Sequence, residues 1–288
     1  MGALISANFD DSRSGDDVWV VAGYAGYANQ WDYFEELWDV ALKKHDVPYF
    51  HMREMADETG PFAKWLPAKD HQKEVIAFYT DLAQATRKSH LRMVASGVWM
   101  PDLEKFNAMH GLSLEAYPLA AYACLVQISQ EYHDAPATAV FDRVEKVDDK
   151  LSKARVYAKS DPRFYPAGPC DSVASRPIPK GITFRNVPAL QAADFICWEV
   201  RKALFGMKDW QLLPDKPQGD RALQWQHYLE HKRNVTGKSE VIRRSLGALI
   251  RDMPVHSVVW DWDQLDSMHA SRRGVWTLEE AASAVQRG

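Results

Sequence analysis

The chain has 288 residues, of which 46% are hydrophobic and 26% charged, and its formal net charge is −4 at pH 7. This composition supports a large buried core, and the mild acidity excludes a protein that coats nucleic acid through general positive charge. No run of about 18 apolar residues occurs, so we expect no membrane span. The three cysteines are widely spaced and form no CxxC pair, which predicts neither a zinc cluster nor a disulfide framework and favours a reducing cytoplasm.

The first part of the chain predicts a hairpin followed by a helix. Apolar and small residues run over 3–9, β-branched and aromatic residues run over 18–28, and the polar link between them contains Gly15. Residues 29–47 then carry large hydrophobic side chains at helical spacing. The short stretch "PYFHMREM" (48–55) is ambiguous.

Predicted helices and strands alternate further along the chain. Helices are expected over 69–89, 112–133 (with an interruption near Pro118), 146–159 and 188–205, and strands over 91–100, 137–143 and 181–187. An opening hairpin with strands alternating with helices after it predicts a mixed α/β sheet with helices on its faces.

The sequence changes character after residue 205, which divides the chain into a predicted α/β domain (1–205) and a C-terminal extension (206–288). Prolines and a glycine mark 208–222 as a connector. Beyond it we expect mainly helical structure, over 220–234, 238–252 and 277–286, with a strand over 255–262. Because the extension holds five tryptophans, we expect it to pack on the main domain or on a second copy of the chain, as in a homo-oligomer.

Two adjacent carboxylates, Asp10 and Asp11, follow the first predicted strand. Neighbouring residues of a strand point to opposite faces, so one of the two must face inward or meet a positive group at the rim. Either a solvated turn or a bound metal ion accounts for such a pair.

Two further aspartates stand at the ends or faces of core elements. Asp142 closes the fourth predicted strand after the apolar run "AVF", and Asp194 lies in the helical stretch "LQAADFICW". The helix neighbours of Asp194 at i−4, i+3 and i+4 are apolar or weakly polar, so its carboxylate should be partly buried. A buried carboxylate must pair, take up a proton or bind a cation.

Carboxylates from several different elements form the kind of oxygen-ligand site that Mg²⁺ or Mn²⁺ prefers. Two such ions roughly 3.5–4 Å apart can hold the attacking and leaving oxygens during phosphodiester cleavage. The alternative needs no metal: Asp10 and Asp11 lie in a turn, Asp142 caps the next helix, and Asp194 pairs with an arginine such as Arg201. Spacing alone leaves both interpretations open.

Two motifs and their order carry a resemblance to a known family. "DDSR" (10–13) follows the first strand and "LQAAD" (190–194) lies on a late helix, with "FHMRE" and "VFDR" between them. In these motifs and their order, residues 3–205 resemble the family filed as domain of unknown function number 3800. Members of that family carry an Asp-Glu-Ser-Gly-like motif and a Leu-Gln-x-Ala-Asp-like motif.

The resemblance implies a ribonuclease H-like fold with a metal-dependent carboxylate cluster of the nuclease type. Asp10 matches the aspartate of the first motif, Asp194 matches that of the second, and Asp142 stands where such folds place another ligand. Asp11 replaces the usual glutamate and Arg13 replaces the glycine. These two departures shorten one acidic side chain and bring a positive charge to the rim.

Other candidate residues lie near these motifs. His51 and Glu54 are three residues apart, so on a helix they share a face and can orient a water or take up a leaving-group proton; a structural histidine beside aromatic residues is the alternative. Three basic residues that flank the cluster in sequence can hold phosphates or form solvated surface: Arg143, Lys180 and Arg185. No GxSxG, Walker or GxGxxG motif is present.

The sequence therefore predicts a ribonuclease H-like protein that acts as a divalent-metal-dependent nuclease or phosphodiesterase. Its Mg²⁺ or Mn²⁺ ligands would be Asp10, Asp142 and Asp194, with Asp11 auxiliary, and its substrate a nucleic acid or another phosphodiester. The competing hypothesis is a non-catalytic binding or assembly module on the same scaffold, with the tryptophan-rich extension as its contact surface.

Overall fold

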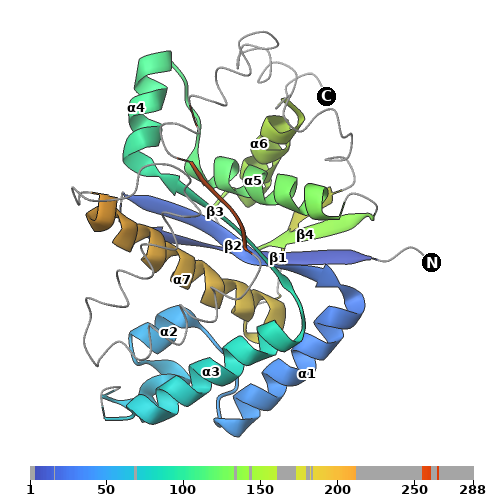
Figure 1. Cartoon of the computed structure of the whole chain (residues 1–288), viewed down its shortest axis with the longest axis vertical. Helices are drawn as coiled ribbons and strands as arrows, with labels where there is room; N and C mark the ends of the chain where they lie inside the picture. The colour runs from blue at the N-terminus through green and yellow to red at the C-terminus, as the bar shows by residue number, and fades with distance from the viewer. Residues whose placement is uncertain are drawn as a thin grey trace.

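The computed structural model describes residues 4–15, 17–67, 70–132, 135–142, 145–160, 173–179, 182, 184–211, 255–260 and 265. These residues form a mixed sheet with helices on both faces, visible as three layers in Figure 1. The six strands are β1 (Ile5–Ser14), β2 (Val18–Tyr27), β3 (Arg92–Trp99), β4 (Ala137–Phe141), β5 (Val173–Pro177) and β6 (Val255–Trp260). The predicted mixed α/β architecture is confirmed.

The strands stand in the order β5-β4-β1-β2-β3-β6. β1, β2 and β3 form an antiparallel group, as the predicted opening hairpin requires. β4 pairs in parallel with the free edge of β1, and β5 pairs in parallel with β4. β4 pairs with β1 only as far as Phe9↔Phe141, whereas β1 continues to Ser14.

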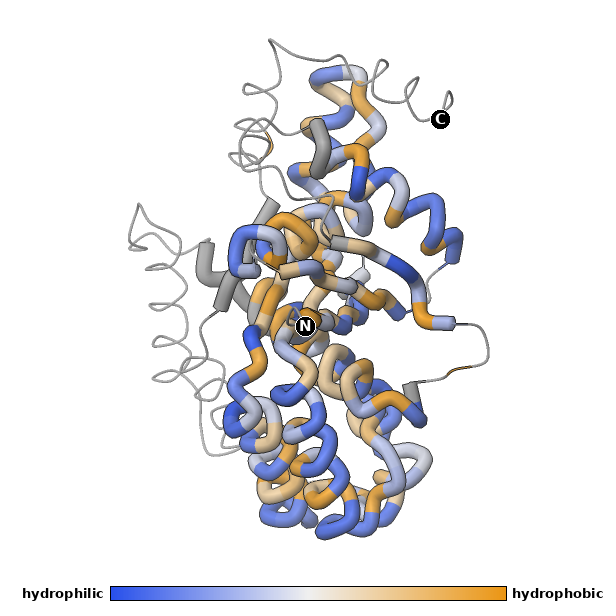
Figure 2. Tube along the Cα trace, turned by 90° about the vertical axis from the view of Figure 1, so that its right-hand side faces the viewer, coloured by the Kyte–Doolittle hydropathy of each residue, from blue (hydrophilic) through white to orange (hydrophobic). Residues whose placement is uncertain are grey.

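Each face of the sheet packs on its own hydrophobic cluster. One face is covered by α1 (Ala28–Lys44), α2 (Met52–Ala56), the 3₁₀ segment η1 (Gly60–Trp65), α3 (Gln72–Lys88) and α7 (Pro188–Gln211). The other face is covered by α4 (Met100–His110), α5 (Ala116–Glu131) and α6 (Val147–Ser160). Hydrophobic residues, orange in Figure 2, gather around the middle of the trace, where the sheet lies.

The helix that follows the hairpin matches its prediction closely. The side chains that α1 buries recur at helical spacing: Trp31, Phe34, Trp38, Ala41 and Leu42. α5 begins at Ala116, which places Pro118 in its first turn rather than at an interruption. A proline is tolerated there because the first backbone N–H groups of a helix have no partner within the helix.

Two further sequence predictions differ from the structure, and one helix was not predicted. The first strand does not end at residue 9, so Asp10 and Asp11 lie inside β1 rather than after it. The predicted strand over 181–187 is wrong, because Phe184–Asn186 form a 3₁₀ turn (η4) and the fifth strand is β5. β5 ends in a proline, which an edge strand tolerates but which obscures a strand pattern. Helix α4 was not predicted, although Pro101 and Gly111 mark its two ends.

Part of the C-terminal extension belongs to the same sheet. β6 pairs in parallel with β3, which confirms the strand expected near 255–262, and Leu265 is fully buried in the cluster beneath α5. The helices expected over 220–234, 238–252 and 277–286 lie outside the described residues, as do Trp225, Trp262 and Trp276. Within the described part of the chain, no helix has both the length and the apolar character that crossing a membrane requires.

The pairing of β1 with β2 depends on a glycine. A Cβ atom added to Gly23 would lie 1.8 Å from the backbone oxygen of Asn8, a distance that no packed atoms can adopt. Asn8 is two residues before Asp10, so this close approach sets the path of the strand that carries the first candidate ligand.

We predict that Gly23→Ala lowers the free energy of unfolding by roughly 2–4 kcal/mol, because the clash is with backbone that cannot move aside. Gly111→Ala is the matched control. Its φ of +64° is left-handed but no atom lies within 4 Å of the added Cβ, so only about 1 kcal/mol should be lost. Urea denaturation of both variants tests this, and equal losses would contradict it.

Candidate active site

Helix α7 approaches β1 and β2 closely through small side chains. Ala192 and Ala193 are fully buried. One turn further on, the Cys197 thiol donates to the backbone oxygens of Asp10, at 3.4 Å, and of Val20, at 3.5 Å. This contact places the same helix that carries Asp194 directly over the strand that carries Asp10.

Asp142 reaches the same place from β4. Its backbone N–H donates to the Phe9 oxygen at 2.9 Å and extends the parallel pairing by one residue beyond the strand. Asp142 therefore lies next to Asp10 where β4 ends and β1 continues, as expected for residues at the carboxyl ends of parallel strands.

The three carboxylates interact with one another. Burial raises the pKa of Asp10 well above its usual value, and the negative charges of Asp194 and Asp142 raise it further. Burial raises the pKa of Asp194 to about 6, and the charge of Asp142 adds to the rise. The side chains of Asp10 and Asp194 also share a hydrogen bond, which requires a proton on one of them. The structure thus brings Asp10, Asp142 and Asp194 together from three elements.

Asp11 lies on the opposite face of the sheet from Asp10, because the two are neighbours within a strand. Burial raises the pKa of Asp11 to about 6, and the positive charge of Lys150 opposes the rise. The Lys150 ammonium lies 5.5 Å from the centroid of the Trp19 ring and 5.3 Å from that of Tyr117. Cation–π contacts with two aromatic rings therefore hold this lysine beside Asp11.

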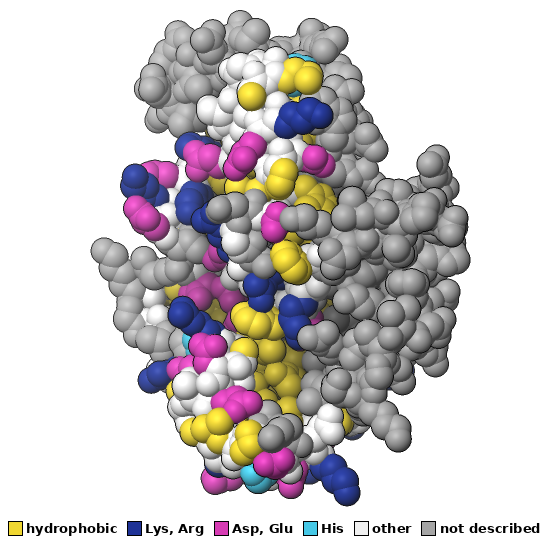
Figure 3. Space-filling view, turned by 90° about the vertical axis from the view of Figure 1, so that its left-hand side faces the viewer, with side chains coloured by type: hydrophobic (Ala, Val, Ile, Leu, Met, Phe, Trp, Pro, Cys, Tyr) yellow, Lys and Arg dark blue, Asp and Glu magenta, His cyan; other side chains and the backbone are white. Residues whose placement is uncertain are grey.

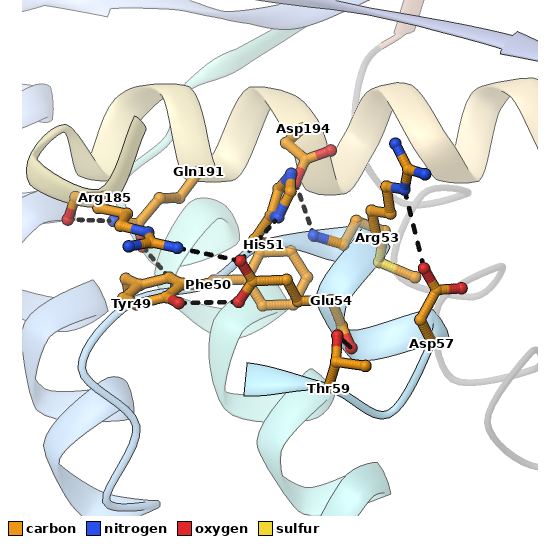
Figure 4. Close-up of polar contacts among 11 residues, drawn as sticks. Tyr49, Phe50, His51, Arg53, Glu54, Asp57, Thr59, Arg185, Gln191 and Asp194 are labelled. Carbon is orange, nitrogen blue, oxygen red and sulfur yellow. Dashed lines mark hydrogen bonds and ion pairs between the residues drawn. The ribbon is translucent and has the colours of Figure 1, made fainter. Parts of the chain in front are cut away.

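The "LQAAD" motif fixes the segment before α2 (Figure 4). Gln191 Oε1 accepts the Phe50 backbone N–H at 2.9 Å, and Asp194 Oδ2 accepts that of Met52 at 2.7 Å. The two motif residues stand one helical turn apart, and their side chains accept hydrogen bonds from the backbone N–H groups of alternate residues. His51, between those two N–H groups, is thereby placed beside Asp194, and its charge lowers the pKa of that carboxyl.

Glu54 connects His51 to a basic residue that lies far away in sequence. His51 Nδ1 lies 3.5 Å from Glu54 Oε1, so the two side chains are neighbours, although His51 precedes helix α2 as its extended N-cap residue. Arg185 in η4 donates to Glu54 at 3.3 Å, and the Tyr49 hydroxyl donates to it at 2.8 Å. Partial burial raises the pKa of Glu54, but Tyr49, Arg185 and His51 outweigh this effect, so the pKa is lowered.

The structure excludes two of the alternatives that spacing left open. Asp10 and Asp11 do not lie in a turn, because they pair with Ala22 and Val21 of β2. Among the described residues Asp194 forms no ion pair with Arg201, whose guanidinium instead lies 4.0 Å from the centroid of the Trp198 ring.

Not every candidate that the sequence singled out is part of the described site. Arg143 and Lys180 lie outside the described residues, and Arg185 has its place beside Glu54.

Sequence reasoning missed three members of the site. Gln191 was noted only as part of a motif, although it is 1% exposed and therefore needs polar partners. Tyr49 lies in the stretch that the sequence left ambiguous. Lys150 was one of several basic residues on a predicted helix, and nothing in the spacing distinguished it from a solvated lysine.

Among the residues that the structure describes, no group of three or more histidine, cysteine, aspartate and glutamate side chains is arranged to hold a metal ion. The carboxylates meet, but not as a ready coordination sphere. No family model, curated protein or solved structure matches the chain.

We predict that Gln191→Met lowers the free energy of unfolding by roughly 2–5 kcal/mol. The amide accepts from Phe50 and from Trp38 Nε1 and donates to the Arg185 oxygen, so three polar groups lose their partner. Gln127→Met is the control: this buried amide makes a single bond, at 3.3 Å to the Ala95 oxygen, and should cost about 1 kcal/mol or less. Urea denaturation distinguishes them, and similar losses would show that Gln191 has no special structural role.

The raised pKa of Asp194 predicts a pH-dependent gain in stability for Asp194→Asn in the presence of a chelator. Well below pH 3.8 the carboxyl is protonated in both the folded and the unfolded protein, so its charge has no effect. As the pH rises from the unfolded pKa, 3.8, to about 6, the unfolded chain loses the proton first and wild type is destabilised. The variant should gain roughly 1–3 kcal/mol relative to wild type above pH 6 and little at pH 4. Urea melts at both pH values test this; an advantage that is equal at both, or larger at pH 4, would contradict it.

Proposed function

We propose that the protein is a divalent-metal-dependent phosphodiesterase or nuclease. The observation that supports this most directly is the mutual repulsion of Asp10, Asp142 and Asp194, three carboxylates that meet from separate elements; the charge of Asp142 helps to raise the pKa values of Asp10 and Asp194. A cluster of this kind is costly unless protons or cations neutralise it. A divalent cation does so while leaving the carboxylates ionised.

The donor chemistry fits Mg²⁺ or Mn²⁺, which prefer carboxylate oxygens. Asp10, Asp142 and Asp194 would hold the ion, and at least one of these side chains would turn toward it, because the described side chains form no ready ligand group. When bound, such ions supply Lewis-acid stabilisation of the attacking and leaving oxygens of a phosphodiester.

The neighbouring residues can handle a proton. His51 lies beside Asp194 and its Nδ1 is 3.5 Å from Glu54 Oε1, so a carboxylate flanks the ring on each of two sides. In this proposal His51 takes a proton from the attacking water or returns one to the leaving oxygen. Glu54, with its lowered pKa, stays ionised and orients His51.

The sheet supports the fold that the family resemblance implies. The sheet has an antiparallel group β1–β2–β3, with β4 and β5 parallel to β1 on its other edge, and this strand order is consistent with a ribonuclease H-like core. The proposal that the chain is a member of the family with domain of unknown function number 3800 rests on this arrangement together with the two motifs.

A second candidate function is a non-catalytic binding or assembly module on the same scaffold. The observation that favours it is that no described group of side chains is arranged as a ready metal site. In this case Asp10 and Asp194 would remain neutralised by shared protons.

We predict that Mn²⁺ stabilises the wild-type protein by mass action. A ligand that binds only the folded state adds about 2.7 kcal/mol at a hundredfold excess over its dissociation constant. Asp194→Asn keeps the shape of the side chain and can still accept the Met52 N–H, but it removes one charge and weakens the ligand set. At pH 7.5 with chelator the variant should be at least as stable as wild type, and with millimolar Mn²⁺ it should gain little. Thermal melts of both proteins in both conditions measure this.

The control for this experiment is Asp39→Asn, which removes a half-exposed carboxylate of α1 that pairs with Lys43. It should leave the response to Mn²⁺ intact. Hydrolysis of bis(p-nitrophenyl) phosphate with Mn²⁺ then tests the reaction, and Asp194→Asn should abolish it. A wild-type protein that neither responds to the ion nor hydrolyses the phosphodiester would refute the enzyme and favour the binding module.

A further inference from the structure

The carboxylates lie in the middle of a row of charged side chains that has a basic residue at each end. The charge row is the following set, named so that each member interacts with the next: Lys150, Asp11, Asp10 with Asp142, Asp194, His51, Glu54 and Arg185. The row crosses β1 from the α6 face to the α7 face, beyond the point where the pairing with β4 stops.

We propose that Lys150 and Arg185 bind two phosphate groups on either side of the scissile one, so that the substrate is a nucleic-acid strand rather than a single nucleotide. This inference rests on the proposed function, because the carboxylates between the two basic residues must be the centre that cleaves the bond.

The Arg185 end of the row is anchored but still reaches solvent. Its guanidinium lies 4.7 Å from the centroid of the Tyr49 ring and donates to Glu54, while its side chain remains 54% exposed. Its backbone oxygen is fixed by Gln191 Nε2 at 3.1 Å. An arginine that is oriented on one side by a carboxylate and an aromatic ring presents its other N–H groups in a defined direction, which suits a phosphate.

The Lys150 end is held in a different way. Trp19 and Tyr117 lie under its ammonium, and Arg13 adds a second positive charge, at 5.3 Å from the centroid of the Trp19 ring. This end of the row therefore has two basic groups around one indole ring, next to the only carboxylate of the row on that face, Asp11.

One phosphate group cannot reach both basic ends, because the carboxylates and His51 separate them. A strand carries a phosphate at every nucleotide, so in this proposal successive phosphates contact Lys150, the carboxylates and Arg185 in turn. On the face of the molecule seen in Figure 3, lysine and arginine side chains lie above and below acidic side chains near the middle of the view. Such local positive groups also explain how a chain with a net charge of −4 could bind a polyanion.

The test measures binding of a fluorescein-labelled 12-nucleotide single strand, as DNA and as RNA, by anisotropy with Ca²⁺ in place of Mn²⁺. Arg185→Gln and Lys150→Met should each weaken binding about 3- to 10-fold, and each should lower the slope of log affinity against log salt by about 0.7. Arg185→Lys should recover most of that slope, which a purely structural role would not predict. Thermal melts show whether each variant is folded.

The matched control is Arg53→Gln. Arg53 is also an arginine with a carboxylate partner, Asp57 at 3.7 Å, and is 81% exposed on α2, but it is outside the charge row. It should change binding less than twofold. In turnover with Mn²⁺, the loss of kcat/KM in Arg185→Gln should be several-fold larger on the 12-nucleotide strand than on bis(p-nitrophenyl) phosphate.

Four results would overturn the inference. If Arg185→Gln and Lys150→Met bind the strand as Arg53→Gln does, neither residue holds a phosphate. If the Arg185→Gln substitution lowers kcat/KM equally on both substrates, Arg185 acts at the scissile phosphate and not beside it. If wild type hydrolyses bis(p-nitrophenyl) phosphate but binds no strand, the substrate is a small phosphodiester and the proposed function stands without this inference. If wild type neither hydrolyses bis(p-nitrophenyl) phosphate nor binds a strand, the proposed function fails and this inference fails with it.

Discussion

The repulsion among Asp10, Asp142 and Asp194 is the interaction on which the site depends. Three adjacent, partly buried carboxylates repel one another strongly when all are ionised, and His51 is the basic side chain among the described ones that lowers the pKa of Asp194. The fold nevertheless brings them together: β4 ends beside Asp10, and the Cys197 thiol of α7 donates a hydrogen bond to the backbone oxygen of Asp10. A polypeptide that only needed stability would place apolar residues at such a crossing, so the arrangement favours a site that awaits a cation.

The "LQAAD" motif has two functions that spacing alone does not reveal. Its glutamine is structural, because it satisfies the N–H groups of Trp38 and Phe50 and the oxygen of Arg185. Its aspartate belongs to the carboxylate cluster and also accepts the Met52 N–H. The two alanines between them let the helix lie close to the sheet. The motif therefore links the positions of the cluster, of His51 and of Arg185, and a change in one of its residues would move all three.

The sequence predicted the parts of this protein that depend on local pattern. The spacing of Trp31, Phe34 and Trp38 predicted α1, and the apolar run before Asp142 predicted β4, because periodicity reports which face is buried. It placed the fifth strand wrongly because β5 is an edge strand whose register depends on β4 and not on its own composition. It also left Lys150 unrecognised, because the aromatic pair that holds this lysine comes from β2 and α5 and meets it only in the folded chain.

The aspartate at position 11, where the Asp-Glu-Ser-Gly-like motif has a glutamate, has a physical explanation in this fold. Asp10 and Asp11 face opposite sides of β1, so Asp11 cannot point at Asp194 in the way that Asp10 does. Its charge is instead balanced by Lys150, the largest effect that opposes burial in setting its pKa. A shorter side chain suits this role, because it keeps the carboxylate near the strand and leaves the lysine over Trp19. In the proposed metal site the ligands would therefore be Asp10, Asp142 and Asp194, while Asp11 would orient the basic group at one end of the charge row.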